Sequence, residues 1–436
     1  MSQQPYQKLK KFSLEMNINI LKSFNSGLFI VISLLIVSIP NFEAPKNILS
    51  IALILGWLLK AYNSRDWGGS WNLFDTIVAT WIITNLIVGL NAYFFIKQPI
   101  GGIADIFRYV LIGWVFSRIK FDESQIKILV FLVLISLLGP MLNFLGPKLG
   151  FFVCKAGISC YELNSVGHIN HSGVYMLFSL TVVILYSINK WDNISLLTKS
   201  ILIVCSIILA IIEIKTHSRA VLFGLAIFGI YVFLKLYIRS NIFLTLLILL
   251  SLILSYSLAL HKFKSTHVFE RYTNELSIFD DDSARKKINN FSIELFRQQP
   301  IFGIGMDNFP NFTLDDIRQS VIDRKGNEFW ELNQDTYRPY AHPHNSFISY
   351  LVGGGIALFL VFAFFWFKTI HSVYKLTINK ISNSDNWLIE SVAFLVLYHL
   401  TIGMVNTVFA NENAIFTMIF IGILINRLRF LESKKI

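Results

Sequence analysis

Two histidines lie where a long polar region of the chain ends and a membrane-length apolar run begins. His342 and His344 flank a proline and directly precede the glycine-rich apolar segment Phe347–Trp366. Imidazole has an ordinary pKa of about 6.5, which suits a general base at neutral pH. A single histidine at a water–lipid boundary is usually incidental. Two of them, followed by Asn345 and Ser346, whose side chains can cap the next helix, favour a chemical role.

Arg219 is a candidate for binding an anion. It ends the short turn Thr216-His217-Ser218-Arg219 between two apolar runs and opens the second of them. The free N–H groups and the dipole at the start of a helix favour an anion there, and Ser218 is placed to cap that helix. The alternative is an arginine that only extends its head into water at a helix end. The planar guanidinium fits a phosphate, so anion binding is favoured.

Two further arginines have a pairing alternative. Arg108 lies inside an apolar run, where a charge is costly and is therefore a functional hypothesis. Asp105, three residues earlier on the same helix face, offers an equally good structural role. Arg285 lies at the start of a helix predicted after Asp280–Asp282. A phosphate ligand and a pair with those acids both fit Arg285, and the residues alone favour the pair.

Other kinds of site have little support in the residues. His168 and His171 precede another apolar run and either line the same cavity or anchor the chain at the interface. Zinc is a weak alternative, because the nine histidines include no His-Glu-x-x-His and no close Cys/His quartet. No Walker loop, dinucleotide fingerprint or nucleophile elbow is present, so no nucleotide is expected. Arginines combined with a histidine at the lipid surface imply transfer from an energised, lipid-linked phosphate donor to an acceptor hydroxyl.

Membrane helices must position these residues. Of the 436 residues, 54% are hydrophobic and only 15% are charged. Apolar runs of about 17–25 residues recur along the chain, and each can cross roughly 30 Å of hydrocarbon. We therefore predict an all-α polytopic membrane protein with one membrane domain over residues 1–436. About twelve spans are expected: Gly27–Ile39, Ile48–Tyr62, Trp71–Phe95, Ile100–Phe116, Ile126–Leu145, Ser172–Ile188, Ser200–Ile214, Ala220–Tyr237, Ile242–Leu260, Asn345–Phe367, Leu388–Val408 and Ala414–Ile425.

Loop charges predict the orientation of these spans. Lysine and arginine are concentrated in both tails and in alternate short loops, and such segments face the cytoplasm. Both termini are therefore expected inside, and two large loops, residues 146–171 and 261–343, outside. The larger loop is expected to be partly helical and to cover the membrane domain as a lid or clamp. The net charge of +11 does not indicate nucleic-acid binding, because acids slightly outnumber bases from His261 to Pro343.

Cys154 and Cys160 lie six positions apart in the smaller outer loop. An oxidising outer compartment would permit a disulfide between them. Two free thiols are an equal alternative, because sequence spacing does not give the distance between Cα atoms.

The histidine segment resembles bacterial O-antigen ligases and their relatives, the O-antigen polymerases and some protein O-oligosaccharyltransferases. That family's motif is His, then Asn, Ser or Gln, then nine residues, Gly, two residues and Gly. Here His344-Asn345 is followed after nine residues by Gly355, while Leu358 replaces the last glycine. His342, two residues earlier, also fits many relatives.

Two other segments extend the resemblance over about residues 165–360. The turn that ends in Arg219 is similar to the Ser/Thr-Arg turn of the family. Arg285 and the Pro-x-x-Gly-x-Gly turn that contains Gly303 and Gly305 are similar to the family's outer loop. The first 150 residues match only in being a membrane bundle.

The resemblance implies an inverting, metal-independent glycan transfer without a cofactor, at the periplasmic face of the bacterial inner membrane. The donor would be a glycan on undecaprenyl pyrophosphate, and the acceptor a hydroxyl of lipid A–core. His344, or else His342, would take or orient the proton of that hydroxyl. The arginines would hold the pyrophosphate. The site residues implied are His342 and His344 for catalysis, Arg219, Arg285 and Arg108 for the pyrophosphate, and Ser218, Asn345, His171, Gly303, Gly305 and Gly355 in support.

Other functions fit the same residues. A polymerase extending the glycan on its carrier, or a transferase acting on a protein serine or threonine, would use the same groups. A transporter of lipid-linked sugars would favour internal repeats and charges lining a path through the membrane. The chain has no clear repeat, and its histidines and arginines gather on one predicted side, so an enzyme is favoured.

Overall fold

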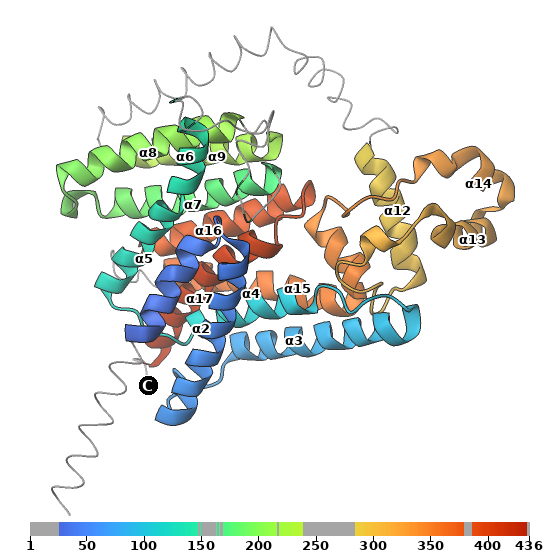
Figure 1. Ribbon diagram of the computed structural model, residues 1–436, viewed down its shortest axis with the longest axis horizontal. Coiled ribbons are helices and arrows are strands. Elements are labelled where there is room, and N and C mark those ends of the chain that lie inside the picture. The colour runs from blue at the N-terminus through green and yellow to red at the C-terminus, as the bar shows by residue number, and fades with distance from the viewer. Residues whose placement is uncertain are drawn as a thin grey trace, which may run out of the picture.

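The computed structural model describes residues 26–146, 149, 163, 165, 169–215, 218–238, 284–378 and 386–433. These residues form helices and connections, and none of them lies in a strand. The helices make up an elongated bundle with a smaller helical group at one end (Figure 1). The predicted all-α class is confirmed for the part of the chain that is described.

The bundle consists of apolar helices. An N-terminal helix, Ser26–Ser38, comes first. It is followed by α2 (Glu43–Ser64), α3 (Leu73–Asn91) with a π-helical turn η1 (Ala92–Ile96), α4 (Ile103–Phe116), α5 (Glu123–Ser136), α6 (Leu138–Leu145), α7 (Ile169–Asn189), α8 (Leu196–Lys215), α9 (Arg219–Ile238), α15 (Ser346–Ile378), α16 (Asn386–Thr401), the 3-10 turn η6 (Ile402–Met404) and α17 (Asn411–Ser433). Of these, α3, α7, α8 and α15 run along the long axis of the molecule, while α2, α5 and α6 cross it steeply (Figure 1).

Eight of the described helical segments are long and apolar enough to cross a membrane. The predicted spans Gly27–Ile39, Ile100–Phe116 and Ser200–Ile214 coincide with Ser26–Ser38, α4 and α8, which are helices but do not belong to those eight. Ile242–Leu260 lies outside the described residues. The prediction of a helical membrane protein therefore holds, whereas the number of twelve spans stays a prediction.

The smaller group contains the described part of the predicted 261–343 loop. It consists of α12 (Ala284–Gln298), η4 (Phe309–Asn311), α13 (Leu314–Lys325), α14 (Asn327–Asn333) and η5 (Gln334–Thr336). α12 buries one face, with Ile288, Phe291 and Leu295 at helical spacing. Phe309 packs edge-on against Phe291, with their ring centroids 5.5 Å apart. The group thus has a small apolar core of its own.

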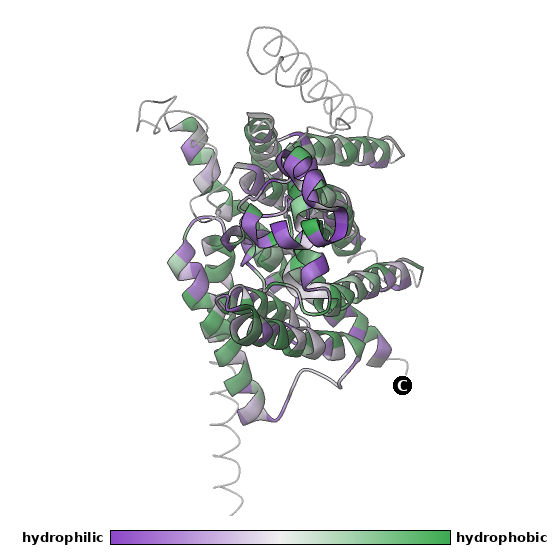
Figure 2. Cartoon of the chain, turned by 90° about the vertical axis from the view of Figure 1, so that its right-hand side faces the viewer, coloured by the Kyte–Doolittle hydropathy of each residue, from purple (hydrophilic) through white to green (hydrophobic). Residues whose placement is uncertain are grey.

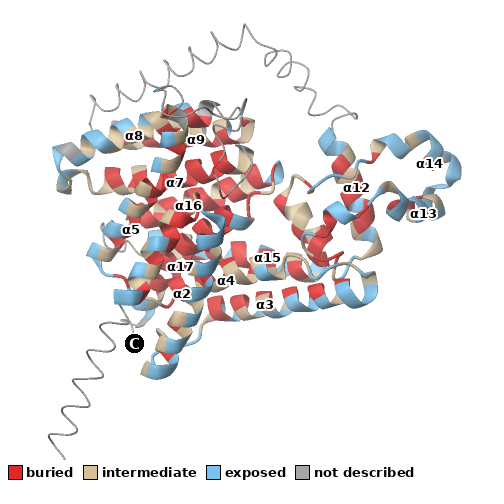
Figure 3. Ribbon diagram, in the orientation of Figure 1, coloured by how far each residue is buried: buried red, intermediate tan, exposed pale blue. Residues whose placement is uncertain are grey.

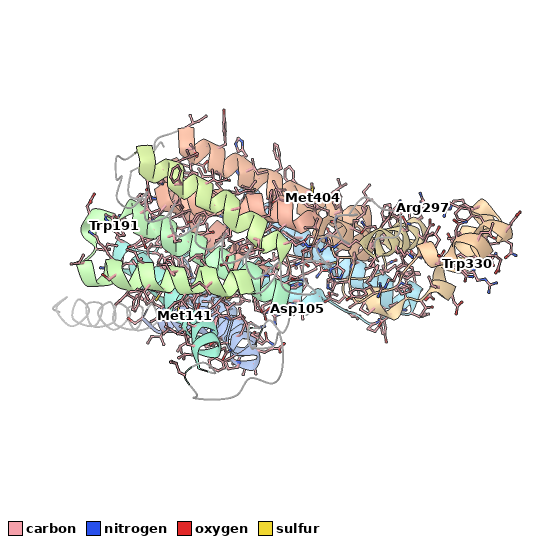
Figure 4. The ribbon with its side chains drawn as sticks, turned by 90° about the horizontal axis from the view of Figure 1, so that it is seen from above. Asp105, Met141, Trp191, Arg297, Trp330 and Met404 are labelled. Carbon is pink, nitrogen blue, oxygen red and sulfur yellow. The ribbon has the colours of Figure 1, made fainter. Side chains whose placement is uncertain are left out.

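The two cores meet at the start of α15. Val352 of α15 belongs to the small core, and Ile348 packs against it. Figure 3 shows buried residues throughout the bundle and on part of α12, while α13 and α14 are mostly exposed. Viewed from this end, hydrophilic segments lie in front of hydrophobic helices (Figure 2). Figure 4 shows Trp330 of the small group and Trp191, between α7 and α8, at opposite ends of the molecule.

Candidate functional site

The two histidines form a compact pair at the end of the bundle that carries α12. Their ring centroids are 4.0 Å apart. The backbone N–H of His344 donates to Nδ1 of His342 at 3.3 Å. His344 has φ 53°, in the left-handed region, which few residues with a Cβ adopt. Such a conformation persists only where the surroundings hold it, and it is often found at functional sites.

Thr407 and His171 bring two other segments to this pair. The Thr407 hydroxyl lies 3.2 Å from Nδ1 of His342. The His171 ring, at the start of α7, stands edge-on to that of His342 at 6.1 Å between centroids. Asn413 of α17 donates to the backbone oxygen of His171 at 3.4 Å. The structure therefore places the His171 ring beside that of His342, while a role for His171 in the site stays a prediction.

Asn345 begins α15 as its sequence position predicts. Its side-chain oxygen accepts the backbone N–H groups of Phe347 at 2.9 Å and Ile348 at 3.0 Å. Its amide nitrogen donates to the backbone oxygen of Met404 at 2.9 Å. One side chain thus caps α15 and fastens it to η6, so the residue directly after His344 has a fixed position.

Ser346 fastens the same connection at a second point. Its hydroxyl donates to the backbone oxygen of Asn406 at 3.1 Å and accepts the N–H of Val408 at 2.8 Å. Asn345 and Ser346 therefore hold the segment between α16 and α17 in place. Thr407, which contacts His342, lies in this segment.

Gly355 interrupts α15. Its φ is 62° and its ψ is −171°, a conformation essentially limited to glycine. The backbone groups released by this break pair with the loop between α12 and η4. Ile304 and Gly305 donate to the backbone oxygens of Val352 and Gly353 at 3.0 and 2.9 Å. Ile356 and Ala357 donate to those of Pro300 and Ile301 at 2.8 and 3.1 Å.

The predicted motif glycines lie at this junction. A Cβ on Gly355 would lie 2.2 Å from the carbonyl oxygen of Ile301. A Cβ on Gly303 would lie 2.4 Å from the carbonyl oxygen of Val352. A Cβ on Gly305 would lie 2.7 Å from that of Ala92. Gly303 and Gly355 therefore let the backbones of the loop and of α15 touch, so that the small group is attached to the helix that follows His344, whereas Gly305 lets the loop approach the end of α3.

Arg285 lies in the first turn of α12, and its side chain is exposed. Two residues later, the backbone oxygen of Lys287 accepts the N–H of Arg338 at 3.1 Å. Asn290 donates to the backbone oxygen of Thr336 at 3.1 Å. The start of α12 is thus bound to the chain that leads into the histidines. Within the described residues, Arg285 forms no ion pair, and the acids Asp280–Asp282 lie outside them.

Arg338 and Tyr340 connect this region to the histidine pair. The Arg338 guanidinium lies 5.7 Å from the centroid of the Tyr340 ring. That ring is in turn 5.0 Å from the His344 ring and 6.1 Å from the His342 ring, measured between centroids. Arg338 is exposed and forms no ion pair with any residue that the structure describes.

Arg219 is the first residue of α9 and is half-buried. The buried Ser218 precedes it, and its backbone oxygen accepts the N–H of Leu222 at 2.9 Å, as at the start of a helix. Further along α9, Gly224 faces Ile402 of η6, and η6 is fastened to Asn345. α9 therefore adjoins the turn that holds the start of α15.

Arg108 has the partner that its sequence position offered. Its guanidinium donates to Asp105, three residues earlier in α4, and to the side-chain oxygen of Asn47 in α2. The geometry shows the helix-face pair that the sequence left open. A role for Arg108 in pyrophosphate binding stays a prediction.

A buried ion pair lies at the same end of the bundle. Lys46 of α2 binds Glu412 of α17, and both side chains are nearly inaccessible. Ser165 accepts from Lys46 at 3.1 Å and donates to Glu412 at 2.9 Å. Burying an ion pair is costly unless further hydrogen bonds complete it. This triad fixes the start of α17 directly after the connection that carries Thr407.

The sequence interpretation missed Arg338, Tyr340 and Thr407. Arg338 and Tyr340 could have been identified from the sequence, because a basic and an aromatic residue directly precede the histidines. Thr407 had none, because it lies far along the chain. Several predicted positions fall outside the described residues, namely Thr216, His217, His168 and the proposed disulfide partners Cys154 and Cys160.

Comparison with known families agrees with the sequence resemblance. Residues 201–363 match the family model described as O-antigen ligase. The matched segment contains Arg219, Arg285, both histidines and Gly355. No curated protein matches the chain significantly. The family points to a glycosyltransferase-like enzyme that acts on lipid-linked glycans, and the apolar helices fit an integral membrane protein. The match over residues 201–363 supports the assignment of this chain to the O-antigen ligase family.

Proposed function

We propose that this protein is an O-antigen ligase, which moves a glycan from undecaprenyl pyrophosphate to a hydroxyl of lipid A–core at the periplasmic face of the bacterial inner membrane. One observation carries the proposal. A histidine pair lies at the end of the bundle, Tyr340 connects it to the exposed Arg338, and the Arg338 backbone binds the first turn of α12, which carries the exposed Arg285. All of these residues lie within the segment that matches the family. With the histidine pair at the periplasmic face, both termini of the chain would lie in the cytoplasm.

His344 is the better candidate for the general base. Nδ1 of His342 accepts the backbone N–H of His344, so this nitrogen carries no proton of its own. In neutral His342 the proton is therefore on Nε2, which makes Nε2 a donor. A base needs a free lone pair facing the acceptor. We assign proton removal to His344, and to His342 the task of holding the His344 backbone in its left-handed conformation.

The transfer needs one base and a stabilised leaving group. The acceptor oxygen attacks the anomeric carbon of the donor glycan, and the bond from that carbon to the phosphate oxygen breaks. The configuration at the anomeric carbon inverts. The hydroxyl proton passes to His344, and undecaprenyl pyrophosphate leaves with the electron pair of the broken bond. No covalent enzyme intermediate is required, because pyrophosphate is already a good leaving group.

Cationic side chains supply the electrostatic part of the reaction. Guanidinium groups fit phosphate oxygens in a planar, two-point manner. Arg219, Arg285 and Arg338 would bind the pyrophosphate and stabilise the charge that develops as it leaves. The break at Gly355 supports this assignment, because it attaches the group that carries Arg285 to the helix that begins directly after His344.

Reconstitution of the full chain in lipid nanodiscs tests the proposal. Polyprenyl-pyrophosphate-linked glycan would be supplied with lipid A–core, with a second copy of the lipid-linked glycan, or with a serine-containing acceptor peptide. Glycosylated lipid A–core is the expected product. Products only from the second or the third acceptor would instead identify a polymerase or a protein glycosyltransferase. Donor that crosses the bilayer without any transfer would identify a transporter.

A deletion strain provides the matching cellular test. Lipopolysaccharide gels should lose all O-antigen bands while polymer accumulates on the carrier. A single-repeat cap would indicate a polymerase, and unchanged lipopolysaccharide would contradict both functions.

A further inference from the structure

A cavity lies at the end of the bundle opposite the histidine pair. It has a volume of about 270 Å³ and is lined by the N-terminal helix Ser26–Ser38, by α2, and by the connections on either side of α3 and α4. α4 fixes its position, because Gly101 and Gly102, just before α4, touch Met306 and Asp307 of the small group, whereas Arg118, just past its far end, lines the cavity.

The cavity wall combines cationic and apolar side chains. Lys60 of α2 and Lys120, between α4 and α5, line it. Leu28, Phe29 and Ile32 of the N-terminal helix also line it. A site of this composition accommodates a charged group and the alkyl chain attached to it.

Among the described residues, the two lysines are the cations of the wall that form no ion pair. The ammonium groups of Lys60 and Lys120 form no hydrogen bond and no ion pair with a residue that the structure describes, although the Asp66 carboxylate attracts the ammonium group of Lys60. Arg118, by contrast, is bound by Asp75 and by the backbone oxygens of Trp67 and Gly69. Asp66 also lines the cavity, but its Oδ1 accepts the N–H of Gly68 at 2.9 Å. The cavity wall therefore carries two lysines that form no ion pair and only one carboxylate.

Aromatic residues indicate that the cavity lies at the level of a membrane surface. The Trp57 ring, which lines the cavity, lies 4.8 Å from the Trp114 ring and 5.9 Å from the Trp67 ring, measured between centroids. Tryptophan is enriched where lipid head groups meet water. Ile30 and Leu34, on another face of the N-terminal helix, are 58% and 52% exposed, as expected of side chains that meet lipid.

We propose that this cavity binds an anionic phospholipid, with the phosphate at Lys60 and Lys120 and an acyl chain along Phe29 and Ile32. Basic pockets between membrane helices on the cytoplasmic side bind anionic head groups in this way. The volume of about 270 Å³ is just below the roughly 300–1,000 Å³ of ordinary small-molecule pockets, so the cavity can hold the head group and the first part of one acyl chain of such a lipid. This site is independent of the proposed transfer reaction, because it lies at the opposite end of the bundle.

Lipid retention by the full chain tests this site. The protein would be purified into nanodiscs that contain equal amounts of phosphatidylglycerol and phosphatidylcholine, and the lipids it retains would be measured by native mass spectrometry. Retention of phosphatidylglycerol at least tenfold over phosphatidylcholine is expected, and equal retention would overturn the site. Lys60→Gln and Lys120→Gln should each reduce that preference, whereas Lys127→Gln, an exposed lysine of α5 that does not line the cavity, should preserve it.

Two controls distinguish lipid binding from damage to the fold and from binding of small free anions. Lys60→Arg keeps the charge, so it should retain the lipid; a loss equal to that of Lys60→Gln would show damage to the fold instead of loss of a phosphate contact, and would overturn the assignment. Soluble glycerol phosphate should not displace the bound lipid at millimolar concentration. Displacement would show a site for small free anions, which contradicts a lipid site.

Discussion

Two groups of arginines at opposite ends of the bundle differ in how their charge is balanced. In the first, which we call the closed cluster, Asp75 lies between Arg118 and Arg429 and binds both at 2.6 Å. Trp114 adds an N–H at 2.8 Å to the same carboxylate. In the second, the open site, Arg338 is exposed and is connected to the histidine pair by Tyr340, while Arg285 is exposed on α12, whose first turn binds the Arg338 backbone.

The closed cluster uses its charge to hold the fold. Arg118 donates through Nε and both terminal nitrogens, to Asp75 and to two backbone oxygens of the α2–α3 connection. Arg429 reaches the backbone oxygen of Ser70 at 2.7 Å and so ties α17 to the same connection. A guanidinium whose donors are used in this way has little left for a ligand.

The open site has the opposite balance. Within the described residues, neither Arg285 nor Arg338 forms an ion pair, although both lie on segments with fixed backbone contacts. A cation that is held in place and left unpaired can bind an incoming anion without first breaking a bond. An arginine whose donors are paired with a carboxylate therefore has a structural role, whereas an arginine without an ion pair can bind a ligand.

Removal of the central carboxylate should break the closed cluster. Asp75→Asn leaves two arginines facing each other in a buried place, and the loss of one partner from such a group costs about 3–5 kcal/mol. Chemical unfolding of the purified protein in detergent should show this loss. Asp66→Asn, an exposed carboxylate of the neighbouring connection, serves as the control and should change little. Equal stability of both variants would contradict a structural role for Asp75.

Substitution of Gly355 should damage the open site without touching a charge. Gly355→Ala forces a side chain into a glycine-only conformation and against a carbonyl oxygen, at a cost of about 2–3 kcal/mol. α12 should then become accessible to protease, and transfer should fall. Gly27→Ala is the control, because a Cβ there meets nothing within 4 Å. Wild-type resistance to protease in Gly355→Ala would contradict the junction as described.

Neutralisation of the open arginines should reduce activity but not stability. Arg285→Gln and Arg338→Gln each remove a charged contact worth about 1.5–3 kcal/mol, or roughly 10- to 100-fold in kcat/KM. Their free energies of unfolding should stay within about 0.5 kcal/mol of wild type. Arg318→Gln, an exposed arginine of α13 that lies 3.8 Å from Glu331, is the matched control. Stability losses comparable to that of Asp75→Asn would remove the distinction between the two groups.

An exposed ion pair should matter least. Lys375 and Glu432 bind each other at 2.6 Å on the surface of the bundle. Because water and salt screen such a pair, Glu432→Gln should cost less than about 1 kcal/mol. Unfolding curves and transfer rates should both resemble those of wild type, and a large loss would show that exposure is a poor guide to the importance of a charge in this protein.

The helices could be predicted from the sequence, but their number of crossings could not. Long apolar runs have one stable form in lipid, so the spans at α3, α7, α15 and α17 follow from composition. Short runs such as Ser26–Ser38 do not settle by length whether they cross. The break in α15 could not be predicted from the sequence either, because Phe347–Trp366 is one continuous apolar run. The loop that pairs with the break lies some fifty residues earlier in the chain.

The candidate site was predictable only as separate pieces. Local sequence patterns identified the histidines, Arg219, Arg285 and the glycines. How these residues are arranged in space depends on contacts between distant segments of the chain. Thr407 approaches His342 because Ser346 holds the α16–α17 connection, and no local pattern announces this. Arg108 is the opposite case. Its sequence position fitted both a ligand-binding role and a pair with Asp105, and only the structure shows its bonds to Asp105 and Asn47.

The central claim is that His344 takes the proton of the acceptor hydroxyl. The most direct test is single-turnover transfer by His344→Ala in nanodiscs, with saturating lipid-linked glycan and lipid A–core, beside His371→Ala at the far end of α15. General base catalysis contributes about 10²–10⁴-fold. His344→Ala should therefore lose at least about 100-fold in rate with unchanged unfolding, while His371→Ala keeps the wild-type rate. A wild-type rate in His344→Ala would contradict the role of His344 as the general base.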